Sequence, residues 1–118
     1  MVPDVQEPAP IVTAVVAALA GVRNGQTVVV LGPGTRLRAA LEAGTGVPLA
    51  EVGPADVVVA LGATDVPGAV GLLRPGGRLV ALAADHGAVE RSAARYGLVV
   101  RHLEAVDGRI AWSASLRT

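Results

Sequence analysis

The sequence predicts an α/β fold of three layers, with helices on both faces of a mainly parallel sheet of about five strands. Short apolar runs that are bounded by turn residues are typical of buried parallel strands. Three such runs occupy residues 27–31, 56–62 and 78–83. Segments with helical spacing follow them at residues 35–43, 65–73 and 86–96. The alternation of apolar strands and helices predicts parallel pairing of the three strands.

The end of the chain predicts an antiparallel hairpin. Residues 98–106 and 109–116 are two strand-like runs, and Asp107-Gly108 joins them. This dipeptide favours the two-residue turn of a hairpin because both of its residues tolerate positive φ. We therefore expect the mainly parallel sheet to close with two antiparallel strands.

A further helix is expected ahead of the first strand. Pro10 is a favoured first residue of a helix, and either Gly21 or the Asn24-Gly25 pair can end it. The residues expected on its buried face are Ile11, Val15, Ala18, Leu19 and Val22. Residues 1–9, which are rich in proline, are expected to form an extended arm, and residues 10–118 a single domain.

Composition narrows the classes of function. Hydrophobic residues make up 52% of the 118 residues but aromatic residues only 2%, so the core must be built from valine, leucine and alanine. Ten arginines balance ten acidic residues, which predicts neither a nucleic-acid nor a membrane-surface partner. Without cysteine, disulfides and thiolate metal sites are excluded, and we predict no metal site. The apolar stretch 11–22 is too short to span a bilayer. We expect a bacterial, cytoplasmic protein.

The strand at residues 27–31 ends in the glycine turn Gly32-Pro33-Gly34-Thr35, which leads directly into a helix. Glycine lets a ligand approach the backbone closely, and the first amides of a helix can bind an anionic or polar group. The pattern therefore predicts a binding site at residues 32–35. The alternative is a turn that only closes the strand onto the helix.

This turn resembles the first motif of class I S-adenosylmethionine-dependent methyltransferases, in which a hydrophobic strand runs into G-x-G-x-G. Residues 56–60 resemble the fourth strand of that family, and residues 72–80 look like its L-x-P-G-G motif before the fifth strand. The closing hairpin is similar to the sixth and seventh strands. The resemblance covers the chain from about Pro10 onward and implies a Rossmann-like fold. Two positions depart from the pattern: Val30 stands where the family usually has an acid, and Arg36 replaces the third glycine.

The resemblance also shows what is shortened in this chain. Parallel neighbours need a crossover of about a dozen residues, but only residues 53–55 separate any strand at 47–52 from the strand that begins at Asp56. We therefore expect residues 45–55 to form a loop or irregular edge in place of the second and third strands. Glu51 is the candidate for the acid that binds the ribose hydroxyls in the family, with a solvated loop charge as the alternative.

The resemblance implies further site residues at the end of the next strand. Ala60, Leu61 and Gly62 are expected to line the cofactor together with residues 32–35. Asp65 is a candidate catalytic base, with capping of the following helix as the alternative. His86 is a second candidate base, with a plain surface histidine as the alternative. Methyl transfer needs little acid–base help when the acceptor is already nucleophilic, because alignment supplies much of the acceleration.

The family resemblance implies a small, truncated methyltransferase-like domain that binds S-adenosylmethionine or S-adenosylhomocysteine. The alternative is a non-catalytic interaction module that keeps the fold. A nicotinamide-binding fragment fits less well, because Leu37 occupies the third glycine position of that fingerprint and the chain ends in a hairpin. Loss of the second and third strands makes residues 27–31 an edge strand, which is a template for pairing. We therefore expect a homodimer or another protein partner to cover this edge.

Overall fold

The structure is a computed structural model that describes residues 8–116, so residues 1–7 of the expected arm lie outside it. In chain order the elements are α1 (Pro10–Ala20), β1 (Val28–Leu31), α2 (Thr35–Thr45), β2 (Ala55–Ala60), a 3₁₀ helix η1 (Ala63–Asp65), α3 (Val66–Leu72), β3 (Leu73–Ala83), α4 (His86–Tyr96), β4 (Leu98–Val106) and β5 (Arg109–Leu116). The sequence predicted these α-helices and strands but not η1, and the bounds of α4, β4 and β5 are those expected.

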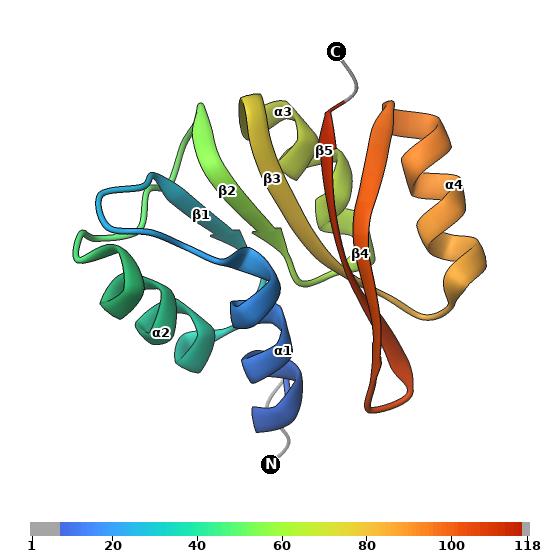
Figure 1. Ribbon diagram of the computed structural model, residues 1–118, viewed down its shortest axis with the longest axis horizontal. Helices are drawn as coiled ribbons and strands as arrows, with labels where there is room; N and C mark the ends of the chain where they lie inside the picture. The colour runs from blue at the N-terminus through green and yellow to red at the C-terminus, as the bar shows by residue number, and fades with distance from the viewer. Residues whose placement is uncertain (1–7, 117–118) are drawn as a thin grey trace.

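The five strands form one sheet in the order β1-β2-β3-β5-β4 (Figure 1). β1, β2 and β3 pair in parallel, whereas β5 pairs antiparallel with both β3 and β4. The mainly parallel sheet with a closing hairpin is thus confirmed. β1 is an edge strand, as expected from the shortened connection that follows α2.

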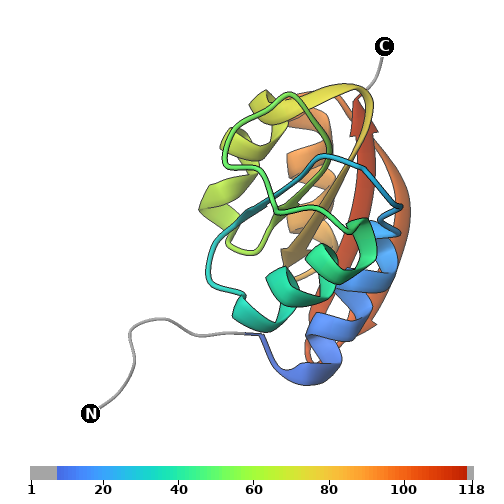
Figure 2. The same cartoon turned by 90° about the vertical axis from the view of Figure 1, so that its left-hand side faces the viewer.

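Two apolar cores lie on opposite faces of the sheet, and the helices cover both faces (Figures 1 and 2). α1 and α2 pack on one face, where Val16 and Leu37 are fully buried against Val30 and Val59. α3 and α4 pack on the other face, where Trp112 is 1% exposed. Small and β-branched side chains allow this close approach of helices to the sheet.

The hairpin follows the local chemistry of its turn. Asp107 and Gly108 have φ values of 51° and 75°, as a two-residue turn with two left-handed residues requires. β5 lies between β3 and β4, so it is buried on both faces, with Ile110, Trp112 and Ala114 on the side of α4.

The buried face of α1 differs from the expected one. Val12, Val16 and Ala20 are buried, while Ile11 is 61% exposed. The helix is apolar on nearly all sides, so hydrophobic spacing alone does not locate its inner face. Gly21 ends the helix in the left-handed conformation, as one of the two expected stop signals.

β3 begins earlier than the strand expected at residues 78–83, so that residues 74–77 lie within it. Leu73 pairs with Ala55 and Arg78 pairs with Val57, so the strand bulges between these two positions. A Cβ atom at Gly77 would lie 2.9–3.2 Å from three backbone carbonyl oxygens. The turn residues therefore form a bulge that lets the chain re-enter the same sheet.

Residues 46–54 form neither helix nor strand, as expected, and they run beside the edge of β1 (Figure 2). The amide of Ala50 donates a 2.8 Å hydrogen bond to the carbonyl oxygen of Val28. Leu49 and Ala50 pack against the two cores. This loop thus covers part of the edge that a second strand would otherwise occupy.

Candidate functional site

The glycine turn leaves β1 with almost no room for side chains. Gly32 has a φ of +103°, which disfavours any residue with a Cβ atom. A Cβ atom there would also lie 3.0 Å from the Cβ of Leu61 and 3.2 Å from Oδ2 of Asp65. Both backbone conformation and close packing therefore require glycine at this position.

The carboxyl end of β2 meets the turn, as the sequence predicted. Ala60 pairs with Leu31, and the amide of Leu61 donates a 3.0 Å hydrogen bond to the Leu31 carbonyl. The Leu61 side chain, which is 6% exposed, extends over Gly34. A Cβ atom at Gly34 would lie 2.7 Å from Cδ1 of Leu61. The structure therefore brings residues 32–35 and 60–62 together, and Leu61 fills the space between them.

Asp65 lies at the same end of the sheet and acts there as a cap. Its Oδ2 accepts a 3.0 Å hydrogen bond from the amide of Gly62, which closes η1. The side chain does not cap α3, the helix that the sequence pointed to. The carboxylate therefore orders the turn after β2, and its role as a base stays a prediction.

His86 lies apart from these residues. It is the exposed first residue of α4 and follows β3, whereas the glycine turn follows β1. β2 separates these two strands. Asp85 caps α4 by accepting a 2.8 Å hydrogen bond from the amide of Ala88, as expected.

Glu51 is exposed and is not brought to the glycine turn. Its neighbour Ala50 is bonded to Val28, the first residue of β1, and the loop then leads to the start of β2. Gly32 follows the opposite end of β1. The ribose-binding role that the resemblance implies for Glu51 stays a prediction.

Arg38, which sequence reasoning did not select, occupies the edge next to the turn. Its Nη2 donates to the carbonyl oxygens of Val30 at 3.0 Å and Gly32 at 2.9 Å. Helical side chains point back toward the N-terminus of their helix, so an arginine in the first turn of α2 can reach the strand before it. The position of Arg38 in the first turn of α2 is the feature of the sequence that could have identified this residue.

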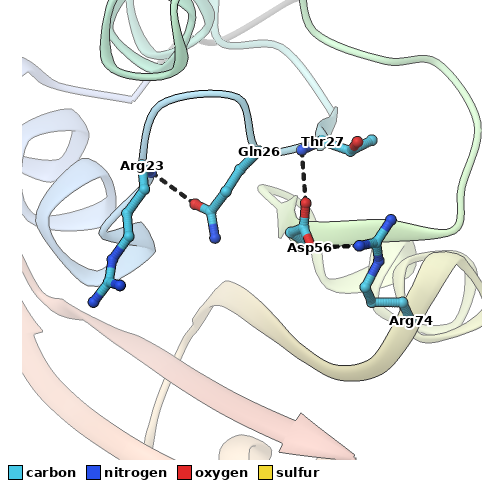
Figure 3. Close-up of polar contacts among 5 residues, drawn as sticks. All are labelled: Arg23, Gln26, Thr27, Asp56 and Arg74. Carbon is cyan, nitrogen blue, oxygen red and sulfur yellow. Dashed lines mark hydrogen bonds and ion pairs between the residues drawn. The ribbon is translucent and has the colours of Figure 1, made fainter.

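The amino ends of β1 and β2 carry a separate polar network (Figure 3). Oδ2 of Asp56 accepts a 2.8 Å hydrogen bond from the amide of Thr27, and Oδ1 forms a 2.8 Å ion pair with Arg74. The amide of Arg23 donates to Oε1 of Gln26 at 2.7 Å. These contacts fix the entry into both strands at the end opposite to the glycine turn.

Four cavities of the described residues do not reach the glycine turn, since none of them is lined by any of residues 32–35. Over residues 8–116, no group of three or more histidine, aspartate or glutamate side chains could hold a metal ion. In the same part of the chain, every helix is too short or too polar to cross a membrane.

Solved structures share this arrangement of strands and helices. Over 99% of this chain and 94% of the other, it superposes on precorrin-6Y C5,15-methyltransferase from Geobacter metallireducens with a TM-score of 0.74 and 11% identity. Over 100% and 73%, it matches a tRNA (m1A58) methyltransferase from Aquifex aeolicus, with a TM-score of 0.66 and 15% identity. The fold is that of the class I methyltransferases.

A third match is a second protein of the precorrin-6Y methyltransferase type. A putative precorrin-6Y C5,15-methyltransferase domain from Corynebacterium diphtheriae gives a TM-score of 0.64 at 14% identity over 91% of this chain and 96% of the other. No protein-family model matches the sequence, and no curated protein matches it either. The methyltransferase-like fold expected from the sequence is thereby confirmed.

The methyltransferase fold allows a test of how the turn fits a cofactor. Glycine at positions 32 and 34 forms a backbone cradle that a ligand could approach closely, but the Leu61 side chain packs over it in this structure. On the edge side, Nη2 of Arg38 donates to the carbonyl oxygen of Gly32. The residues at the turn therefore fit a cofactor only if Leu61 moves.

Proposed function

We propose that the chain binds S-adenosylmethionine or S-adenosylhomocysteine at residues 32–35. The observation that carries this proposal is the meeting of the glycine turn with residues 60–62 at the carboxyl ends of β1 and β2. In open α/β sheets, ligands bind in the crevice outside the carboxyl ends of the strands. When bound, S-adenosylmethionine supplies an electrophilic methyl group.

The residues around the glycine turn have distinct roles in holding the cofactor. The backbone of Gly32 and Gly34 accepts the close approach of the cofactor, and Ala60 and Gly62 flank it. Leu61 must turn away from Gly34 to make room, because its Cδ1 lies 2.7 Å from the place that a Cβ atom of residue 34 would take. This displacement lowers the expected affinity.

Calorimetric titration with both ligands tests the proposal, with a nicotinamide dinucleotide as the control ligand. We expect saturable heat for S-adenosylmethionine and S-adenosylhomocysteine and none for the dinucleotide. The variant Gly34→Ala places a methyl group in the cradle and should weaken binding. The matched control is Gly71→Ala, because Gly71 lies in α3 with no atom within 4 Å of an added Cβ. Absence of heat in the wild type at millimolar ligand would overturn the proposal.

A second candidate is an interaction module that keeps the methyltransferase fold without the cofactor. The packing of Leu61 over Gly34 and the position of Arg38 favour it, because both fill space that a cofactor would take. In that case we propose that a second copy of the chain covers the surface beside β1. Val47 is 40% exposed and Val52 is 72% exposed on the loop that borders this edge.

Sedimentation distinguishes the module from a monomeric binding protein. We expect a dimer at micromolar concentration, and Val52→Asp should dissociate it by placing a charge in the contact. Leu103→Asp is the matched control, since Leu103 is 45% exposed on β4, at the other edge of the sheet. A monomeric wild type, or equal dissociation by both variants, would contradict a contact at β1.

A further inference from the structure

Three cavities meet at Arg78, near the amino ends of β2 and β3. Arg78 lines all three, and Arg101 lines two of them. Arg78 and Ser113 lie on the face of the sheet that carries α1, since Val80, which is paired with Ser113, packs there. This region is at the opposite end of the parallel strands from the glycine turn.

One of these cavities, of about 220 Å³, is lined by hydrogen-bond donors and by α1. Its lining residues are Ala18, Leu19, Arg78, Arg101, His102 and Ser113. No carboxylate lines it. Ser113, which is 3% exposed, places its hydroxyl group in the lining of this cavity.

Both arginines are held in place and keep donors to spare. Nη1 of Arg78 donates to the carbonyl oxygens of Leu19 at 3.1 Å and Ala20 at 3.0 Å. Nε of Arg101 donates to Oγ of Ser115 at 3.0 Å. A guanidinium has five N–H donors, so each head retains donors that no residue in the described part of the chain accepts.

Acidic groups do not neutralise this cluster. Asp56 lines only the third cavity, of about 140 Å³, and its carboxylate is engaged by Arg74 and by the amide of Thr27. Glu104 follows His102 by two residues on β4 and lines none of the three cavities. Arg78 and Arg101, which line the same cavity, carry planar guanidinium groups of the kind that binds carboxylate and phosphate.

The largest of the three cavities provides room for the rest of a ligand. It measures about 470 Å³, a size typical of small-molecule sites, and it shares Arg78 and Arg101 with the donor-lined cavity. Gly76, Gly77 and Leu116 are among its other lining residues. An anionic group bound between the arginines would leave the remainder of the molecule against this apolar and backbone surface.

We propose that this cleft binds a small molecule through a carboxylate or phosphate group, which Arg78, Arg101 and Ser113 hold. The site is independent of the cofactor site proposed at residues 32–35, because it lies at the other end of the strands. Loss of anion binding at this cleft would therefore leave the proposal of cofactor binding at residues 32–35 unaffected.

Two probes test the site and separate the two anion chemistries: inorganic phosphate and citrate, each titrated at constant ionic strength against chloride. Amide and arginine Nε–Hε resonances report where each ion binds. We expect saturable shifts at Ser113, Ser115, Arg78 and Arg101 for at least one of the two ions. Removal of one charge-assisted contact weakens binding about tenfold, so Arg101→Gln should show that loss.

The control is Arg109→Gln, which makes the same change of charge in the same hairpin but at its turn end. We expect this variant to bind within about twofold of the wild type, because a distant surface charge contributes little at constant salt. Ser113→Ala gives a second variant, with weaker binding expected and no change of charge. Shifts that do not saturate with either ion, or equal losses in Arg101→Gln and Arg109→Gln, would overturn the proposal.

Discussion

The two ends of the parallel strands differ in how tightly their side chains pack. At the carboxyl end, Leu61 and Asp65 pack against the glycine turn, and none of the described cavities reaches residues 32–35. At the amino end, three cavities share Arg78, and arginine and serine donors line them. The glycine turn is tightly packed, and the three cavities that share Arg78 lie at the opposite end of the strands.

This difference teaches that a glycine turn can be required by packing as well as by a ligand. Gly32 must be glycine because of its φ and because Leu61 and Asp65 lie so near. A turn selected in this way persists with or without a cofactor. The substitutions below separate packing at the carboxyl end from binding at the amino end.

The largest effect is expected from Leu61→Ala. This change removes a side chain that is 6% exposed and packs on Gly34, and a cavity of this kind costs about 3 kcal/mol of unfolding free energy. Urea denaturation measures the loss. Leu103→Ala on the exposed part of β4 should cost less than about 0.5 kcal/mol. A similar small loss at both positions would show that the carboxyl end is not tightly packed.

A smaller effect is expected from Gly32→Ala, compared with Gly25→Ala. Both glycines have positive φ, but an added Cβ atom at Gly25 meets nothing within 4 Å. We expect about 1 kcal/mol from backbone strain at Gly25 and about 2 kcal/mol at Gly32, where overpacking adds to it. The difference in thermal unfolding between the two variants measures the packing part. Equal losses in the two variants would show that overpacking at Gly32 adds nothing to the backbone strain.

Asp65→Ala should destabilise the protein by about 1 kcal/mol, because the amide of Gly62 loses its acceptor. Asp65→Asn keeps a side-chain oxygen at this position and should restore most of the loss. Chemical denaturation of the two variants provides the measurement. A loss of the same size in Asp65→Asn would show that the negative charge, and not the hydrogen bond, stabilises the turn.

The smallest effect is expected from Arg78→Gln at the amino end. The exposed guanidinium binds two carbonyl groups at the C-terminus of α1, and an exposed contact of this kind contributes about 0.5 kcal/mol. Thermal unfolding at low and high salt measures it, with the larger effect at low salt. A loss as large as that of Leu61→Ala would make Arg78 part of the packed structure and remove the contrast between the two ends.

Many of the helices, strands and turns were predicted from residues that are near neighbours in the chain. Asp107-Gly108 set the hairpin turn, Asp85 and Gly97 set the ends of α4, and valine-rich runs set the buried strands. These signals act between near neighbours in the chain, so they can be found without knowledge of tertiary contacts. The inner face of α1 could not be found in this way, because its apolar residues lie on nearly all sides.

Contacts between residues distant in sequence decided the rest. Leu61 over Gly34, Arg38 on the edge of β1 and Arg78 at the end of α1 all join different elements. Glu51 and Gly32 are brought to opposite ends of β1 by the path of the loop between α2 and β2.

The sequence by itself determined the elements and the hairpin, since periodicity and turn chemistry are properties of short segments. The family of fold came from the resemblance of its motifs to those of the class I methyltransferases. Only the tertiary structure decided which spaces are filled and which remain open. Side-chain packing and the sharing of hydrogen-bond donors depend on the path of the whole chain. That is why the glycine turn was visible in the sequence, while the arginine-lined cleft at the other end was not.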